Sequence, residues 1–138
     1  MKRWLLIPVL ALAGCTTPQI YGLAPQSIEA GKTTNVYHAS ELHRDCSVLS
    51  IPDIEVTSHP KHGTLRVFRT KLRPSGYKPD NLRYKCRTRL VDGIAVEYTP
   101  DPGFTGTDKM ALTTTFHHVT GEVPRDFRES NTISVDVQ

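Results

Sequence analysis

Apolar residues recur at every second position in several short segments of this chain, which is the period of a β-strand with one buried face. The final segment shows it most clearly, with apolar side chains at Ile133, Val135 and Val137. No long segment after residue 15 has the 3.6-residue period of an amphipathic helix. Turn-forming residues separate the segments about every eight to twelve positions, a spacing that predicts an all-β sandwich.

The alternation predicts strands at residues 26–30, 33–37, 48–51, 54–57, 64–72, 82–90, 94–98, 109–116 and 132–138. The pattern slips near Phe68 and Arg69, which predicts a β-bulge. Asp92-Gly93 between apolar runs predicts a type I′ hairpin turn. Residues 40–44 fit a single helical turn with Ser40 as its N-cap. Residues 119–128 are polar and predict a loop.

The first residues have a different pattern, with Lys2 and Arg3 followed by an apolar run from Trp4 to Ala13. A run of about ten residues is roughly half of what a membrane-spanning helix needs, so it predicts a signal peptide. Residues 1–14 are assigned to that signal, 15–25 to a tether, and 26–138 to one globular domain.

The run ends in Leu12-Ala13-Gly14-Cys15, which resembles the lipobox of bacterial lipoproteins. The resemblance implies cleavage before Cys15 and attachment of a diacylglycerol to its thiol, so that the membrane is the first partner. The residue after the cysteine is Thr16 and not aspartate, which favours the outer membrane. The alternative is an ordinary cleaved signal with a chance cysteine.

Cys46 and Cys86 are the other two cysteines. In a chain exported to an oxidising compartment they predict a disulfide, which would close a loop of about forty residues and contribute about 4 kcal/mol in the chain-entropy model. Two free thiols remain the alternative.

Charge is distributed unevenly along the chain. The formal net charge is +3, and it falls to +1 once Lys2 and Arg3 are removed. Between Lys61 and Arg89 there are ten basic residues and one acid, Asp80, so the other residues of the mature chain sum to −8. The predicted strand 82–90 places four cations on one face and thereby gives the candidate binding residues: Arg83, Lys85, Arg87 and Arg89.

Two interpretations of these four cations stay open. They bind an anionic envelope polymer or lipid headgroups, or they form a solvated face paired with acids such as Glu29, Glu55 and Glu97. Nucleic acid is not expected as a partner, because the predicted location is outside the cytoplasm and few aromatic residues lie among the cations.

Three further segments resemble bacterial immunoglobulin-like and cadherin-like surface modules. They are His62-Gly63-Thr64 after Pro60, the turn Tyr98-Thr99-Pro100-Asp101-Pro102-Gly103-Phe104-Thr105-Gly106-Thr107-Asp108, and the final Ile133-Ser134-Val135-Asp136-Val137. The resemblance implies an immunoglobulin-like antiparallel β-sandwich of about seven to nine strands. The turn is expected to be structural, with Phe104 closing one end of the core and Asp108 bonding local amides.

Neither a metal site nor a catalytic site is predicted. His59 and His62 lie in a loop beside a proline, and the neighbours His117 and His118 would point to opposite faces of a strand. No nucleophile-elbow pattern or base with an orienting group is visible, so we expect no enzyme activity and no cofactor.

These expectations combine into a lipid-anchored envelope protein whose immunoglobulin-like domain binds another envelope protein or an anionic polymer. The alternatives are an accessory subunit of a secretion or pilus machine, and an inhibitor or enzyme acting on cell-wall polymer. The oligomeric state does not follow from the sequence.

Overall fold

The structure is a computed structural model that describes residues 25–120 and 123–138. The predicted signal peptide, the candidate lipidation residue Cys15 and all of the tether except Pro25 lie outside the described residues. Nine strands and one short 3-10 helix form in the described part of the chain. Their bounds are β1 Gln26–Ile28, β2 Thr34–Ala39, β3 Glu41–Leu42, β4 Val48–Ser50, β5 Asp53–Ser58, β6 Gly63–Leu72, η1 Tyr84–Thr88, β7 Val91–Pro100, β8 Gly106–Thr120 and β9 Val123–Val137.

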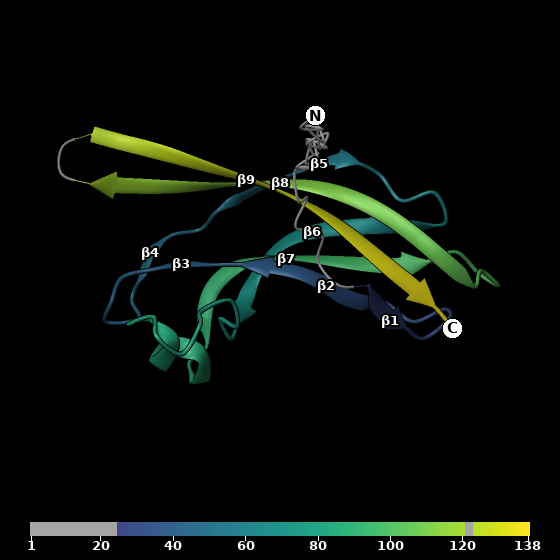
Figure 1. The fold of residues 1–138 in the computed structure, drawn as a ribbon, viewed down its shortest axis with the longest axis horizontal. Coiled ribbons are helices and arrows are strands. Elements are labelled where there is room, and N and C mark those ends of the chain that lie inside the picture. Colours follow the sequence, from purple (N-terminus) through teal and green to yellow (C-terminus); the bar gives the residue numbers. More distant parts are fainter. Residues whose placement is uncertain (1–24, 121–122) are drawn as a thin grey trace, which may run out of the picture.

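The strands form two main sheets that lie over one another (Figure 1). One sheet has four strands in the order β1-β9-β8-β5 and the other has three in the order β2-β7-β6, while β3 and β4 form a separate hairpin. Without the β3–β4 hairpin, the two main sheets contain seven strands, β1, β2, β5, β6, β7, β8 and β9. The second, fourth and fifth of these seven form one sheet, and the third, sixth and seventh lie in the other, as in immunoglobulin domains. The first strand joins the four-stranded sheet and runs parallel to β9. The predicted fold class is therefore confirmed.

The main core lies between the two sheets, and the predicted alternation supplies it. Met110 and Leu112 of β8 are buried, as are Ile133, Val135 and Val137 of β9. Burying each such side chain contributes about 1.5–3 kcal/mol. The remaining buried members of this core are Ile28, Val36, Val96 and Tyr98.

One carboxylate fastens the end of the sandwich. Asp108, at the start of β8, is 3% exposed. Its Oδ1 accepts hydrogen bonds from the amides of Lys61 and Lys109. Its Oδ2 accepts from the amide of His62 and from the hydroxyl of Tyr98. The predicted bonding of Asp108 to a local amide is confirmed for Lys109. Tyr98 donates from the other end of the same turn, and Lys61 and His62 donate from a distant part of the chain.

Residues 82–90 are not a strand, so the predicted arrangement of four cations on one strand face is wrong. They form a turn and the helix η1, because Arg83 donates its amide to Asn81 Oδ1 at 2.8 Å and Cys86 is disulfide-bonded to Cys46. No partner strand covers this segment in the described structure, and Leu82 and Leu90 are 64% and 60% exposed.

The predicted Asp92-Gly93 hairpin is also wrong, since both residues lie inside β7. Asp92 pairs with Lys71 across the sheet, with 2.7 Å between Lys71 Nζ and Asp92 Oδ1. A Cβ at Gly93 would lie 2.6 Å from Leu72 Cδ2 and 2.7 Å from the Ala39 carbonyl oxygen. Gly93 is therefore needed for close packing and not for a turn.

Three smaller predictions are wrong as well. Residues 41–42 form β3 instead of a helical turn, and residues 119–128 lie mainly in the β8–β9 hairpin instead of a loop. β6 pairs with β7 without a register shift, so there is no bulge at Phe68. The interruption of the apolar alternation at Phe68 has another cause. Phe68 lies on the same face of the strand as Arg66, and the Arg66 guanidinium lies 4.0 Å above the Phe68 ring.

Candidate functional site

A basic lobe, defined as residues 73–90, connects β6 to β7 and is held against the domain at several points. The disulfide joins Cys86 in the lobe to Cys46 beside β4, with their Cα atoms 5.4 Å apart. A second apolar cluster forms around this bond: Leu42, Cys46, Cys86 and Val91, with Leu72 and Tyr77 packed against them. Arg83 also donates from Nε to the Leu42 carbonyl oxygen at 2.6 Å. These contacts give the lobe a defined position on the sandwich.

The four candidate cations have different roles in this lobe. Arg83 is half-buried by its bond to Leu42, and the Arg87 guanidinium lies 3.9 Å above the Tyr84 ring. Lys85 and Arg89 are exposed, and neither takes part in the ion pairs found among the described residues. The structure therefore keeps two of the four cations available at the surface.

The acids proposed to neutralise the cations pair elsewhere. Glu97 pairs with Arg66 at 3.1 Å, Glu55 with Arg128 at 3.6 Å, and Glu29 with Lys32 at 3.4 Å. The lobe itself contains six basic residues and the single acid Asp80. Its positive charge is consequently balanced neither by its own acids nor by those three.

The β8–β9 hairpin extends past the rest of its sheet. Pairing of β5 with β8 ends at Thr115, whereas β8 and β9 continue to pair as far as Thr120 and Val123. Figure 1 shows this hairpin projecting beyond β3 and β4. We call residues 116–120 and 123–127 the hairpin overhang. Phe116 and Phe127 lie opposite each other on it, with ring centroids 6.3 Å apart.

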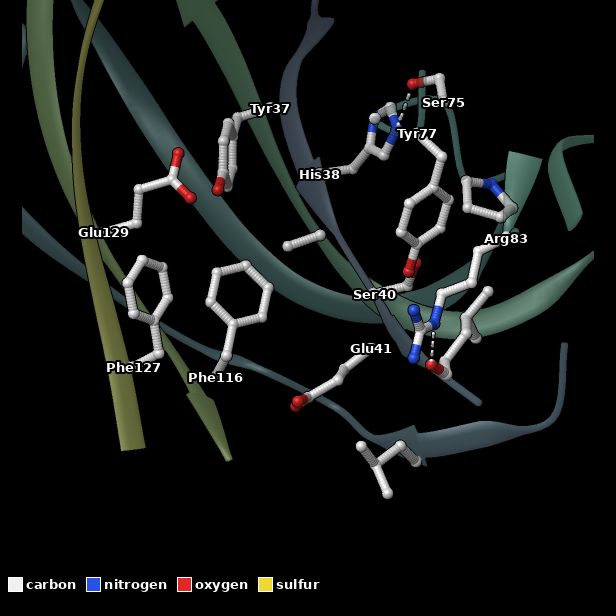
Figure 2. Close-up of a pocket in the computed structure, with 15 residues that line it drawn as sticks. Tyr37, His38, Ser40, Glu41, Ser75, Tyr77, Arg83, Phe116, Phe127 and Glu129 are labelled. Atoms are coloured by element: carbon white, nitrogen blue, oxygen red, sulfur yellow. Dashed lines mark hydrogen bonds between the residues drawn. The ribbon is translucent and has the colours of Figure 1, made fainter. Parts of the chain in front are cut away.

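A groove with a volume of about 610 Å³ separates the hairpin overhang from the basic lobe. Figure 2 shows Tyr37, Phe116, Phe127 and Glu129 along one side, and His38, Ser75, Tyr77 and Arg83 along the other. Phe127 is 54% exposed. Pockets lined by aromatic groups with a few polar side chains are typical of ligand sites.

The polar groups of the groove have defined partners. The Tyr37 hydroxyl lies 2.9 Å from Thr114 Oγ1, and burial raises the pKa of Tyr37. Glu41 is 5% exposed, and its Oε2 accepts from the Ser50 hydroxyl and, at 3.1 Å, from the His117 amide. These bonds fix one wall of the groove before any partner binds.

His38 and Ser75 are the only pair in the described part of this groove that resembles catalytic machinery. Ser75 Oγ lies 2.8 Å from His38 Nε2, and burial lowers the pKa of His38, which keeps the ring neutral at pH 7. A nucleophile also needs an orienting group on the other ring nitrogen. No carboxylate in residues 25–120 and 123–138 donates or accepts a bond at His38 Nδ1.

Two of the four histidines considered as metal ligands, His62 and His117, have other contacts. The His62 ring stacks on Phe104 with centroids 4.3 Å apart. His117 lies between two carboxylates, with Asp53 Oδ2 at 2.8 Å and Asp126 Oδ1 at 3.0 Å. Within the described residues no group of three or more histidine, cysteine or acidic side chains is arranged to hold a metal ion. In the same residues no helix has the length and apolar character to cross a membrane.

The sequence did not reveal this groove, because its walls come from distant segments. Phe116 continues the alternating apolar positions of β8, but the pairing between β5 and β8 has already ended at Thr115. Phe127 was assigned to a loop, although its pairing with Phe116 makes it part of the hairpin. No protein family, curated protein sequence or solved structure matches this chain.

Proposed function

We propose that this chain is a lipid-anchored binding module of the bacterial cell envelope that holds another envelope component without catalysis. The lipobox resemblance at Leu12-Ala13-Gly14-Cys15 supports the anchor, and Thr16 supports the outer membrane over the inner one. Two or more acyl chains on Cys15 would give stable attachment. The immunoglobulin-like domain is then the part that reaches the partner.

The groove between the basic lobe and the hairpin overhang is the observation that carries this proposal. Its hairpin side is aromatic and its lobe side includes Arg83, while the exposed cations Lys85 and Arg89 lie on the same lobe outside the groove lining. Aromatic anchors inside a polar, charged rim are the usual composition of a recognition surface. The partner that fits is a segment of an envelope protein or polymer with both apolar and anionic groups.

Charge reversal tests the binding surface. We expect the double variant Lys85→Glu and Arg89→Glu to lose partner recovery after crosslinking in intact cells and mass spectrometry. Its thermal stability should match that of the wild type, because neither side chain makes an ion pair among the described residues. The control is Lys32→Glu with Lys109→Glu, which changes the net charge equally on exposed residues outside the lobe and the groove.

Recovery of the same partner by the lobe variant would contradict the proposed surface. A Ser75→Ala variant separates binding from hydrolysis, since it removes the serine that is hydrogen-bonded to His38. Unchanged partner recovery with Ser75→Ala supports a non-catalytic role. Turnover of cell-wall polymer that disappears with Ser75→Ala would support an enzyme instead.

The lipid anchor has its own test. A Cys15→Ser variant should fail to incorporate labelled palmitate and should leave the membrane fraction. Retention in the membrane without label would show that the first residues act as something other than a lipoprotein signal.

A further inference from the structure

The β9 strand has a long edge that carries no strand partner in the described structure. β8 pairs with β9 along its whole length, but β1 covers the opposite edge only from Val135 to Val137. Figure 1 shows β1 near the C-terminal end of β9, away from the hairpin overhang. The backbone N–H and C=O groups of every second residue along 123–134 therefore face outward on this edge. An edge of this length is a template for pairing with another strand.

The charges along this edge have opposite signs at equal distances on the two sides of one aromatic residue. The sequence Arg125-Asp126-Phe127-Arg128-Glu129 alternates in sign on both sides of Phe127, and all five residues are exposed. If a second copy of the edge runs antiparallel with Phe127 opposite Phe127, then Arg125 faces Glu129 and Asp126 faces Arg128. Opposite charges at facing positions stabilise a strand pair, and facing aromatic rings add to it.

The two-fold symmetry of an antiparallel dimer limits which residues of 125–129 can face each other. Side chains alternate between the faces of a sheet, so residues that face each other must point to the same side. A two-fold axis perpendicular to the joined sheet must then pass through a residue position. An axis at Arg125, Asp126, Arg128 or Glu129 would place that charge opposite itself. Among axes placed at residues 125–129, only the one at Phe127 avoids a facing pair of like charges, and it is also the one that brings two opposite-charge pairs and two aromatic rings together.

Existing contacts of these side chains are compatible with the pairing. Asp126 uses Oδ1 for His117, and Arg128 lies 3.6 Å from Glu55 with both groups well exposed. Glu129 Oε1 accepts from Asn131 at 3.2 Å. These interactions lie within the strand or across to β8 and β5, whereas the second copy would approach from the free edge. Pro124, which has no N–H group, ends the pairing segment on one side.

We propose that two copies of this chain associate through their β9 edges, antiparallel and with Phe127 at the two-fold axis. The two four-stranded sheets then form one continuous sheet across the dimer. Because Phe127 also lines the groove, the grooves of the two copies meet at the axis. This association stands independently of the proposed partner, since it depends only on the free edge.

Crosslinking of the full-length chain in intact cells tests the register. A Phe127→Cys variant treated with a short bismaleimide should give a product of twice the chain's mass, because facing Cβ atoms in an antiparallel pair lie about 4.5–5.5 Å apart. Ser130→Cys is the control on the same exposed strand. Its two copies would lie about 20 Å apart in this register and should not crosslink. The wild-type protein, treated in the same way, shows whether any crosslinked product forms through Cys15 instead of position 127.

A charge exchange tests the same pairing without a new cysteine. Arg125→Glu and Glu129→Arg each place like charges opposite one another at two positions, so each should weaken dimerisation of the detergent-solubilised full chain by about tenfold or more in sedimentation. The double variant restores opposite charges and should recover wild-type dimerisation.

Three results would overturn the proposal. They are a wild-type chain that sediments as a monomer, a double variant as weak as the single variants, and a Phe127→Cys crosslink to a product of some other mass. The last result would mean that the β9 edge takes a strand from a different protein.

Discussion

Removing the carboxylate of Asp108 should destabilise the domain more than removing any exposed acid. In Asp108→Asn the remaining oxygen can still accept two of the four hydrogen bonds. The amide group would then face the Tyr98 hydroxyl and the His62 N–H, which are both donors. Tyr98 can donate instead to the His62 carbonyl oxygen, 3.2 Å away, so the principal loss is one charge-assisted bond and one unsatisfied N–H.

The expected magnitude follows from these contacts. A hydrogen bond to a charged group contributes about 1.5–3 kcal/mol, and a donor left without a partner costs about 1–3 kcal/mol. We expect Asp108→Asn to cost about 2–4 kcal/mol, and Asp108→Ala to cost more because no acceptor remains. Urea unfolding with an unchanged m-value gives the measurement.

The matched control is Asp101→Asn, an exposed aspartate in the same turn whose own side chain makes no hydrogen bond found in the described residues. It should change stability by less than about 0.5 kcal/mol. If Asp108→Asn costs no more than Asp101→Asn, the carboxylate does not fasten the end of the sandwich and the reasoning is refuted.

The pH dependence provides a second test of Asp108. Burial opposes its ionisation, but hydrogen bonds from Lys61 and His62 outweigh burial and hold the pKa of Asp108 below its usual 3.8. A carboxylate with a lowered folded pKa stabilises above the unfolded value, and this contribution disappears as the pH falls through the folded pKa. The stability difference between wild type and Asp108→Asn should therefore be constant at neutral pH and shrink in strong acid.

Three other perturbations should have separable effects. Replacing both Cys46 and Cys86 with alanine should cost about 4 kcal/mol in urea unfolding, because the disulfide spans 40 residues; a loss below about 1 kcal/mol would contradict this. Hydrogen bonds to Asp53 and then Asp126 raise the pKa of His117, so its stabilising effect is present below the unfolded pKa of about 6.5 and lost as the pH rises through the folded one. The stability gap between wild type and His117→Gln should accordingly be larger at pH 5.5 than at pH 8.5, and an equal gap would exclude the ion pair. Gly63→Ala should destabilise by about 1–3 kcal/mol, because its Cβ would collide with the Tyr98 ring and the Thr99 carbonyl oxygen, whereas Gly76→Ala, with open space around it, should be neutral or slightly stabilising.

Local pattern was enough to predict the strands that form the main core. Along Met110 to Leu112 and Ile133 to Val137 the opposite sheet covers the face that the alternation marks as buried, so a two-residue period translates directly into burial. The Tyr98–Asp108 turn and the disulfide were predictable for a related reason. Proline and glycine restrict the backbone conformations of the turn, and two cysteines in an oxidising compartment usually form a disulfide.

The basic lobe shows where a local pattern misleads. Residues 82–90 alternate without interruption, yet alternation produces a strand only where another strand supplies hydrogen bonds. Here the disulfide and the bond from Arg83 to Leu42 hold the segment away from both sheets. Asp92-Gly93 misled in a similar way, because Gly93 does not adopt the positive φ of a hairpin turn. The groove lies between the basic lobe and the hairpin overhang, and the local pattern misassigned both, so the sequence did not predict it.

The parallel pairing of β1 with the end of β9 has a consequence for how the protein matures. Gln26 to Ile28 have their only strand neighbours in the described structure at Val135 to Val137, the last residues of the fold. During synthesis β1 emerges first and must wait for nearly the entire chain before it can dock, and long-range closure of this kind is slow. The β1 strand can therefore dock only after the residues that end β9 have been made, and a chain shortened to end before Val135 would leave β1 without its strand partner.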